Sequence, residues 1–298
     1  MKVFLQACII LVVLLGISCL PSAAAQKNIS LCEIHYPSDY LYEWDCLKIK
    51  AKDTPYKIFG KFWRDGLRFN RLDRRHFLAG MSIKVPRRVE DIEGFNPMSP
   101  YYQEAENKPQ FILVDQNEMF LGAYEFGNLV LSAPVAVGVE EHRLRNGTYR
   151  IDAVDPVHKS SLYPIRGTKQ PYPMHYGLRF HVGKMGDGWT SYWIHGRDLP
   201  GYPASHGCIG LYDEEMQQRY YGDPSTPLLM DAKMLYQWVV GYRDTGAFQS
   251  FRNGPIVLIM GEPQTILFEP QQPDLPDLPD PPDPADPADP AAVPELVP

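Results

Sequence analysis

Apolar and polar residues alternate through the middle of the chain, beginning at Gln110. The stretch QFILVDQNEMFLGAYEFGNLVLSAPVAVG runs to Gly138, and turn residues interrupt it at 115–118 and 126–128. An alternation with a period of two is typical of strands with one buried face. Further strands are predicted at residues 147–153, 177–182, 190–195, 209–211 and 256–260. The pattern therefore predicts a mainly β domain.

Two later stretches, residues 213–221 and 231–242, show helical spacing instead. In the second, four apolar residues recur at the spacing of one helix face: Met234, Leu235, Trp238 and Val239. We expect this face to pack on a core and both helices to lie at the periphery of the β domain.

The segment before this domain, residues 47–86, has a different order of elements. A short alternating strand opens it, and Asp53-Thr54 can cap a helix that begins directly afterwards. A second short helix is expected around residues 66–70, and Gly80 provides a turn into a closing strand. The predicted order is β-α-α-β.

Three further segments flank or join these parts. Residues 1–25 combine a positive start, a short apolar run and an Ala-Ala-Ala cleavage site, which predicts a secretory signal peptide; lipoprotein processing at Cys19 is the alternative. Residues 91–107 are polar and rich in turn residues, which predicts a linker. Residues 270–298 are nearly all Pro, Asp, Ala and Leu, and such a stretch cannot form a core. We expect export to the periplasm or cell envelope, and a disordered tail.

The formal net charge of −7 at pH 7 comes largely from this tail. The tail holds six Asp residues and Glu295 but no Lys or Arg, so the rest of the chain is close to neutral. A nucleic-acid partner requires a basic patch, and the sequence has none. We therefore expect no nucleic-acid binding.

Three cysteines remain after the predicted signal peptide: Cys32, Cys46 and Cys208. Export favours disulfides, and Cys32 and Cys46 would close a short loop. This pairing leaves Cys208 as an odd cysteine, which indicates a reactive thiol or an intermolecular bridge. A buried structural thiol is the plainer alternative.

Cys208 lies in the stretch IHGRDLPGYPASHGCIGL, residues 194–211. A thiol nucleophile needs a base within reach, and His195, at the end of a predicted strand, could serve. Successive backbone N–H groups of the Ser-His-Gly-Cys turn could hold an oxyanion. Two alternatives stay open on spacing alone: a zinc site of His195, His206 and Cys208, and a surface loop with incidental histidines.

The same stretch resembles the catalytic motif of the L,D-transpeptidases, the YkuD family, in which a strand ending in IHG is followed by SHGC. Upstream residues extend the likeness, with PVAVG at 134–138, NGTYRI at 146–151 and YGLRF at 176–180. The resemblance covers about residues 108–262 and implies a YkuD-like β-sandwich with peripheral helices. We assign the catalytic domain to residues 108–269.

The resemblance also implies roles for individual residues. Cys208 would be the nucleophile and His195 the base, oriented by the backbone carbonyl of Gly196. The backbone amides of His206, Gly207 and Cys208 would form the oxyanion hole. The residues expected to bind substrate are Tyr176, Arg179, Arg197 and Ser205. No metal and no cofactor are implied.

One departure from the family pattern concerns the residue two positions after the cysteine. The family usually has Arg or Asn there, and this chain has Gly210. Arg197 and Arg179 are the two residues that could replace the missing anchor for substrate.

The N-terminal part resembles a LysM domain. The similarity rests on Lys52-Asp53-Thr54-Pro55, on Asn70, and on the closing stretch LAGMSIKVP at 78–86. It implies a small α+β domain at residues 26–90, with its core at 47–86, that binds glycan strands. The alternative is a generic α+β cap.

Together these features predict a peptidoglycan L,D-transpeptidase. Cys208 would attack the bond between diaminopimelate and the terminal D-Ala of a donor stem peptide and pass the acyl group to an amine. That amine would belong to a second stem peptide, giving a 3–3 cross-link, or to a lipoprotein. The alternatives are an L,D-carboxypeptidase or endopeptidase that uses water, and a non-catalytic wall-binding protein.

Overall fold

The computed structural model describes residues 29–165, 167–185, 188–243 and 245–264. The predicted signal peptide (1–25) and tail (270–298) lie outside the described residues, as do residues 265–269 at the end of the predicted catalytic domain. Within the described part of the chain, no helix is both long and apolar enough to cross a membrane.

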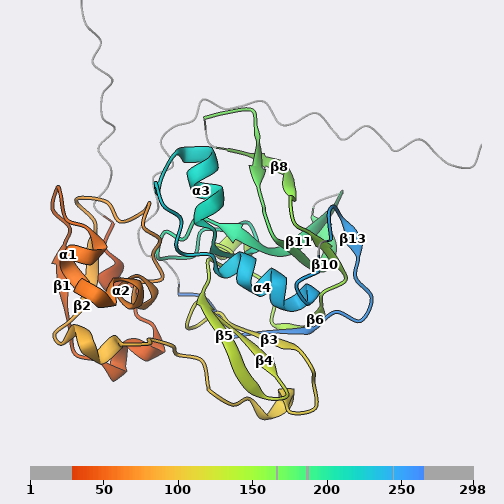
Figure 1. The fold of residues 1–298 in the computed structure, drawn as a ribbon, viewed down its shortest axis with the longest axis horizontal. Coiled ribbons are helices and arrows are strands. Elements are labelled where there is room, and N and C mark those ends of the chain that lie inside the picture. The colour runs from red at the N-terminus through yellow and green to blue at the C-terminus, as the bar shows by residue number, and fades with distance from the viewer. Residues whose placement is uncertain (1–28, 166, 186–187, 244, 265–298) are drawn as a thin grey trace, which may run out of the picture. The chain divides into compact units, whose positions relative to one another are not determined.

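Two five-stranded sheets form the β domain (Figure 1). The first has the order β5-β4-β3-β14-β6: Asn128–Pro134, Phe120–Glu125, Phe111–Asp115, Ile256–Met260 and Gly147–Arg150. The second has the order β12-β11-β10-β7-β13: Ile209–Tyr212, Gly188–Arg197, Gly177–Met185, Ala153–Asp155 and Gln249–Ser250. Most neighbours are antiparallel, whereas β3 pairs in parallel with β14, and β11 with β12. The predicted mainly β class is confirmed.

One hydrophobic cluster joins the two sheets. Val114 and Leu121 of the first sheet are fully buried in the same cluster as Leu178, Ile194 and Ile209 of the second. Burial of each such side chain stabilises the fold by roughly 1.5–3 kcal/mol. The strand expected at 147–153 is interrupted at residues 151–152, where the chain passes from β6 in one sheet to β7 in the other.

Two helices flank the sandwich, α3 (Glu214–Tyr221) and α4 (Asp231–Val240). The side chain of Asp213 accepts a hydrogen bond from the backbone N–H of Met216 and so caps α3. Two residues of the predicted face of α4, Leu235 and Val239, are buried, whereas Met234 is 52% exposed. The remaining buried residues of the helix are Ala232, Tyr236 and Val240.

The sequence pattern does not predict the hairpin of β8 (Lys159–Pro164) and β9 (Pro171–Pro173), which stands apart from both sheets (Figure 1). Most of its residues are exposed, and prolines lie at positions 156, 164, 171 and 173. The segment therefore lacks the apolar alternation that marks a half-buried strand.

The N-terminal part shows the predicted β-α-α-β order. It contains β1 (Trp44–Lys48), α1 (Pro55–Phe59), the 3₁₀ helix η3 (Gly60–Phe62), α2 (Trp63–Phe69) and β2 (Ser82–Pro86). β1 and β2 pair antiparallel, with Leu47 opposite Ile83. Thr54 caps α1 by accepting a hydrogen bond from the N–H of Lys57.

Further 3₁₀ helices complete the described chain: η1 (Leu31–Glu33), η2 (Pro37–Leu41), η4 (Val89–Ile92), η5 (Gln103–Ala105) and η6 (Glu140–His142). A disulfide between Cys32 and Cys46 ties η1 to β1. The stretch expected to be a linker, residues 91–107, buries Ile92, Phe95 and Met98 in a second apolar cluster that includes Phe120 of the β domain.

Buried charges also join the N-terminal part to the β domain. Arg71 is fully buried, and its Nη2 lies 2.9 Å from Oε2 of Glu118. Ser38 donates its hydroxyl to the same oxygen over 2.6 Å. Lys84 pairs with Asp39, and burial lowers the pKa of Lys84 to about 8. Because breaking a buried pair leaves an uncompensated charge, the Arg71–Glu118 pair opposes separation of the two parts.

Candidate active site

His195 and Cys208 lie on neighbouring parallel segments. In the pairing of β11 with β12, His195 is opposite Gly210 and Ile194 is opposite Ile209, and Cys208 directly precedes β12. Successive side chains of a strand point to opposite faces. The side chains of His195 and Cys208 therefore emerge on the same face of the sheet.

The His195 ring is held by its own neighbour in the chain. Its Nδ1 lies 2.7 Å from the carbonyl oxygen of Gly196. A carbonyl can only accept a hydrogen bond, so Nδ1 carries the proton and Nε2 keeps its lone pair. His195 is only 2% exposed, and this burial lowers its pKa to about 3. The imidazole is thus neutral near pH 7 and available as a base.

Gly196 is in turn fixed from two sides. Its N–H donates to the carbonyl of His175 over 2.8 Å, and a side chain at this position would collide with the carboxylate of Asp213. Asp213 is fully buried, and burial raises its pKa to about 6. A glycine is required here, because only glycine allows the carboxylate to approach so closely.

The Ser205–Cys208 turn presents the thiol. Gly207 has a φ of +102°, and a Cβ there would lie 2.6 Å from the ring of Tyr192. The Ser205 hydroxyl donates to the carbonyl of Cys208 over 2.6 Å and accepts the N–H of Gly207 over 3.1 Å. Predicted to bind substrate, Ser205 is instead fully buried and shapes this turn.

The same contacts change the expected oxyanion hole. The N–H of Gly207 is occupied by Ser205. Among the described residues, the backbone N–H groups of His206 and Cys208 have no hydrogen-bond partner. These two amides, rather than three, are free to hold a developing oxyanion.

Cys208 is a free thiol in a largely apolar environment. Burial raises its pKa, and the Trp193 backbone amide and the Arg197 charge offset this only in part. Thiol and imidazole are therefore both neutral at rest. The thiolate has to be formed by proton transfer to His195 during attack.

His206 and the β8–β9 hairpin cover one side of the turn. The His206 ring stacks on Tyr163 of β8 with ring centres 4.1 Å apart, and the ring of His142 lies 4.9 Å away. Burial, together with the His142 and Arg197 charges, lowers the pKa of His206 to about 4. His206 is thus a neutral, stacked side chain that shapes the turn.

Tyr163 is a residue of this site that the sequence pattern does not indicate. Leu162, which precedes it, is 50% exposed, so the segment offers no apolar periodicity to mark a strand. A single tyrosine in an exposed, proline-rich segment gives no signal that it will contact a distant turn. The polar, glycine-containing stretch at 167–170 is the one local feature that favours a hairpin here.

Arg197 occupies the space beside Gly210. A Cβ on Gly210 would lie 2.5 Å from Cδ and 2.6 Å from Cβ of Arg197, so the stem of Arg197 lies across the glycine. Its Nη2 donates to the carbonyl of Ala204, and its buried Nε has no hydrogen-bond partner among the described residues. Arg197 also forms no ion pair with a described carboxylate.

The other two residues expected to bind substrate lie elsewhere. Arg179 is committed to Asp152, with Nε 2.8 Å from Oδ1. Tyr176 donates its hydroxyl to Glu215 over 2.9 Å. Tyr176 lines a surface pocket of about 320 Å³ together with Pro156, Val157, His175, Glu215 and Arg219. Of the two arginines considered as anchors, Arg197 is the one whose positive charge acts on the Cys208 thiol.

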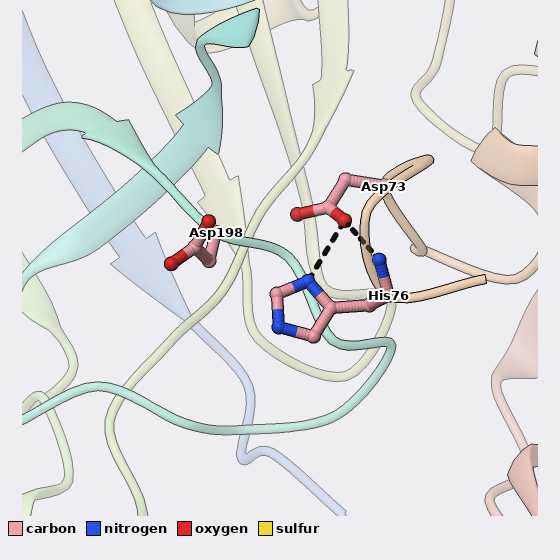
Figure 2. Close-up of side chains that lie close together, drawn as sticks. All are labelled: Asp73, His76 and Asp198. Atoms are coloured by element: carbon pink, nitrogen blue, oxygen red, sulfur yellow. Dashed lines mark hydrogen bonds and ion pairs between the residues drawn. The ribbon is translucent and has the colours of Figure 1, made fainter. Parts of the chain in front are cut away.

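The alternative zinc site is not assembled. Within the described part of the chain, one group of three possible metal ligands comes together, and it consists of Asp73, His76 and Asp198 (Figure 2). His195, His206 and Cys208 do not form such a group among the described residues. The site instead has a free thiol and an oriented, neutral imidazole on one face.

Comparison with known proteins finds one protein family that is similar to part of the chain. Residues 109–244 match the model of the YkuD family, described as the L,D-transpeptidase catalytic domain. The matched residues lie within the part of the chain that resembles the family, and the fold of this part is mainly β, as predicted. No curated protein matches the chain.

Several solved L,D-transpeptidase structures are similar to this chain. That from Mycobacterium smegmatis is 15% identical, covers 51% of this chain and 58% of its own, and has a TM-score of 0.32. That from Stackebrandtia nassauensis is 15% identical over 74% of this chain and 97% of its own, with a TM-score of 0.37. A mutant of the Enterococcus faecium enzyme is 20% identical over 51% and 49%, with a TM-score of 0.31. The chain thus spans 58% of the length of the M. smegmatis structure.

Proposed function

We propose that this chain is an exported peptidoglycan L,D-transpeptidase. The observation that carries the proposal is the hydrogen bond from His195 Nδ1 to the Gly196 carbonyl, because it leaves Nε2 as a base on the face shared with Cys208. The family match over residues 109–244 supports the same class of reaction. The N-terminal sequence, with its apolar run and small-residue cleavage site, supports export to the periplasm.

In the proposed acylation step, His195 Nε2 takes the thiol proton as Cys208 Sγ attacks a carbonyl of the donor. This carbonyl belongs to the bond between the L-centre of diaminopimelate and the terminal D-Ala. A C–S bond forms, and the free amides of His206 and Cys208 stabilise the oxyanion. The C–N bond then breaks, and the imidazolium returns its proton to the amine of the departing D-Ala.

The thioester is resolved by an amine. A side-chain amine of a second stem peptide attacks the acyl carbon, gives its proton to His195, and displaces the Cys208 thiolate, which is then reprotonated. The product is a 3–3 cross-link. If the amine is a lipoprotein lysine, the product is a protein joined to the wall. Water in place of the amine would make the enzyme an L,D-carboxypeptidase or endopeptidase.

Arg197 is the proposed anchor for a carboxylate of the donor peptide. Its positive charge acts on the Cys208 thiol, and guanidinium groups pair well with carboxylates. The N-terminal part is proposed to bind glycan strands as a LysM domain would. Its exposed Tyr40 and Tyr56 offer flat surfaces on which sugar rings can pack.

The test is incubation of the purified protein with disaccharide tetrapeptides, followed by mass spectrometry of the products. A transpeptidase gives 3–3 dimers and free D-Ala, whereas a carboxypeptidase gives tripeptides alone. A carbapenem should form a covalent adduct on the wild-type protein and none on Cys208→Ser. The non-catalytic alternative predicts neither product nor adduct. Turnover that survives Cys208→Ser, or that a zinc chelator abolishes, would overturn the thiol mechanism.

A further inference from the structure

A short segment of the N-terminal part, Leu72–His76, lies against the loop that joins the two catalytic segments. This loop, residues 197–204, follows His195-Gly196 and leads into the Ser205–Cys208 turn. The N–H of Asp73 donates to the carbonyl of Leu199 over 2.8 Å, and Leu72 forms an antiparallel bridge with Pro200. The segment Leu72–His76, although distant in sequence, therefore pairs with the loop through backbone hydrogen bonds.

The carboxylate of Asp73 also accepts a hydrogen bond from this loop. Its Oδ2 accepts the N–H of Leu199 and the side-chain amide of Gln217, each over 2.7 Å. Its Oδ1 lies 2.8 Å from both the N–H and Nδ1 of His76 (Figure 2). Asp73 is fully buried. These donors compensate for the loss of water around the charge.

The same donors show why the Asp73–His76–Asp198 group is not a metal site. Both oxygens of Asp73 are already occupied by protein donors. Asp198 is held by Arg75, with Nη2 3.0 Å from Oδ2, and by Gln217 over 2.9 Å. Gln217 thus bridges both carboxylates. A cation would have to displace an arginine and an amide already in place.

The strand and helix that follow the thiol are held by the same segment. Tyr212, at the end of β12, donates its hydroxyl to the carbonyl of Leu72 over 2.9 Å. Arg74 pairs with Glu214 at the start of α3, with Nε 2.6 Å from Oε1. The segment therefore contacts the chain both before and after Cys208, at the ends of the elements that set the position of the thiol.

We propose that Leu72–His76 is a clasp, with Asp73 as its positioning residue, that fixes loop 197–204 and so sets the distance between His195 and Cys208. The N-terminal part then completes the active site in addition to any role in wall binding. A rate readout in peptide turnover rests on the proposed function. The spacing of base and thiol can also be read without a substrate, from the rate at which iodoacetamide alkylates Cys208.

The central experiment compares Asp73→Asn with Phe95→Leu in the full chain. Phe95 lies in the second apolar cluster, so shortening it destabilises the N-terminal part without touching the loop. Asp73→Asn should lower kcat by roughly 10- to 100-fold with KM changed by less than about twofold, because misplacement by about 1 Å has this effect. It should also change the alkylation rate and its pH profile. Phe95→Leu should lower the melting temperature and leave kcat and the alkylation profile unchanged.

The proposal is overturned if Asp73→Asn alters the melting temperature alone, or if Phe95→Leu lowers kcat equally at matched stability. If Asp73→Asn does not fold, Arg75→Met replaces it, because it removes the ion pair to Asp198 while Asp73 keeps its hydrogen bonds to the loop, and it should give a smaller change in the same direction. An altered alkylation profile in a protein that never cross-links peptides would support the clasp and reject the transpeptidase. An unaltered alkylation profile in an active transpeptidase would reject the clasp and support the proposed function.

Discussion

Arg197 of β11 lies across Gly210 of β12, so that one strand supplies a cation to a position where the other strand has no side chain. The two residues are on the face that also carries His195 and Cys208. Sequence comparison with the family pattern shows only a missing Arg or Asn at position 210. The structure shows that the stem of Arg197, from the neighbouring strand, fills the space beside Gly210.

Arg197→Met should therefore weaken binding of a donor that ends in a free carboxylate. We expect KM to rise by roughly 10-fold or more, the equivalent of one lost charge-assisted hydrogen bond. A donor with an amidated C-terminus should show a much smaller change, and so distinguishes the terminal carboxylate from that of diaminopimelate. Arg252→Met, a change at an exposed arginine with no ion pair among the described residues, is the matched control.

Gly210→Ala tests the same relationship by steric means. The added methyl group would lie 2.5 Å from Cδ of Arg197, so the arginine must move. Overpacking of this kind costs about 1–3 kcal/mol in stability, and donor binding should weaken as in Arg197→Met. If the double variant is no worse than either single one, the two changes act through the same side chain.

Loss of the nucleophile and loss of the base should have different effects. Cys208→Ser should abolish the acyl-enzyme, because a hydroxyl is much less acidic than a thiol. His195→Ala should slow acylation by roughly 10²–10⁴, the usual contribution of a positioned base. Intact-protein mass spectrometry of carbapenem adducts over time measures both. Equal acylation rates for His195→Ala and wild type would show that another group takes the proton.

A buried neutral histidine makes stability depend on pH. The pKa of His195 is lowered to about 3, whereas an unfolded histidine titrates near 6.5. The unfolded chain therefore binds more protons between these values, and stability is present above pH 6.5 and lost as the pH falls. His195→Gln should remove on the order of 2 kcal/mol of the loss between pH 7 and pH 5. Denaturant titrations at several pH values test this, and parallel curves for both proteins would contradict it.

The disulfide can be tested by thiol labelling. In the folded protein, an alkylating reagent should modify Cys208 and leave Cys32 and Cys46 joined. Replacing both bridged cysteines by serine should lower stability by about 3 kcal/mol, as expected for closing a short loop. Peptide mapping without reduction gives the pairing directly. Any disulfide that includes Cys208 would contradict the assignment.

The elements that could be predicted from the sequence are those specified locally. Thr54 caps α1 and the alternation after Gln110 forms strands, because each signal depends on residues a few positions apart. Met234 shows the limit of periodicity: its spacing fits the apolar face, but α4 is rotated so that Tyr236 is buried instead. Which way a helix turns is decided by the surface it packs against.

Likewise, only part of the candidate active site could be predicted from the sequence. The motif around His195 and Cys208 can be recognised in the sequence, whereas Ser205, a predicted substrate contact, is buried within the turn. Asp73 and Tyr163 both lie far before His195 in the sequence, Asp73 in the N-terminal part and Tyr163 in an exposed hairpin. No local pattern connects residues so far apart, and only the tertiary fold places them.

The buried ion pair between Arg71 and Glu118 limits how the N-terminal part could be removed or replaced. A chain that began at residue 108 would keep Glu118 but lose Arg71 and Ser38, its partners, and would uncover Phe120. Wall-binding modules that hang on a flexible tether can be exchanged freely between enzymes. Any domain put in place of this N-terminal part would have to supply a guanidinium at the same depth, or leave the Glu118 carboxylate without its partner.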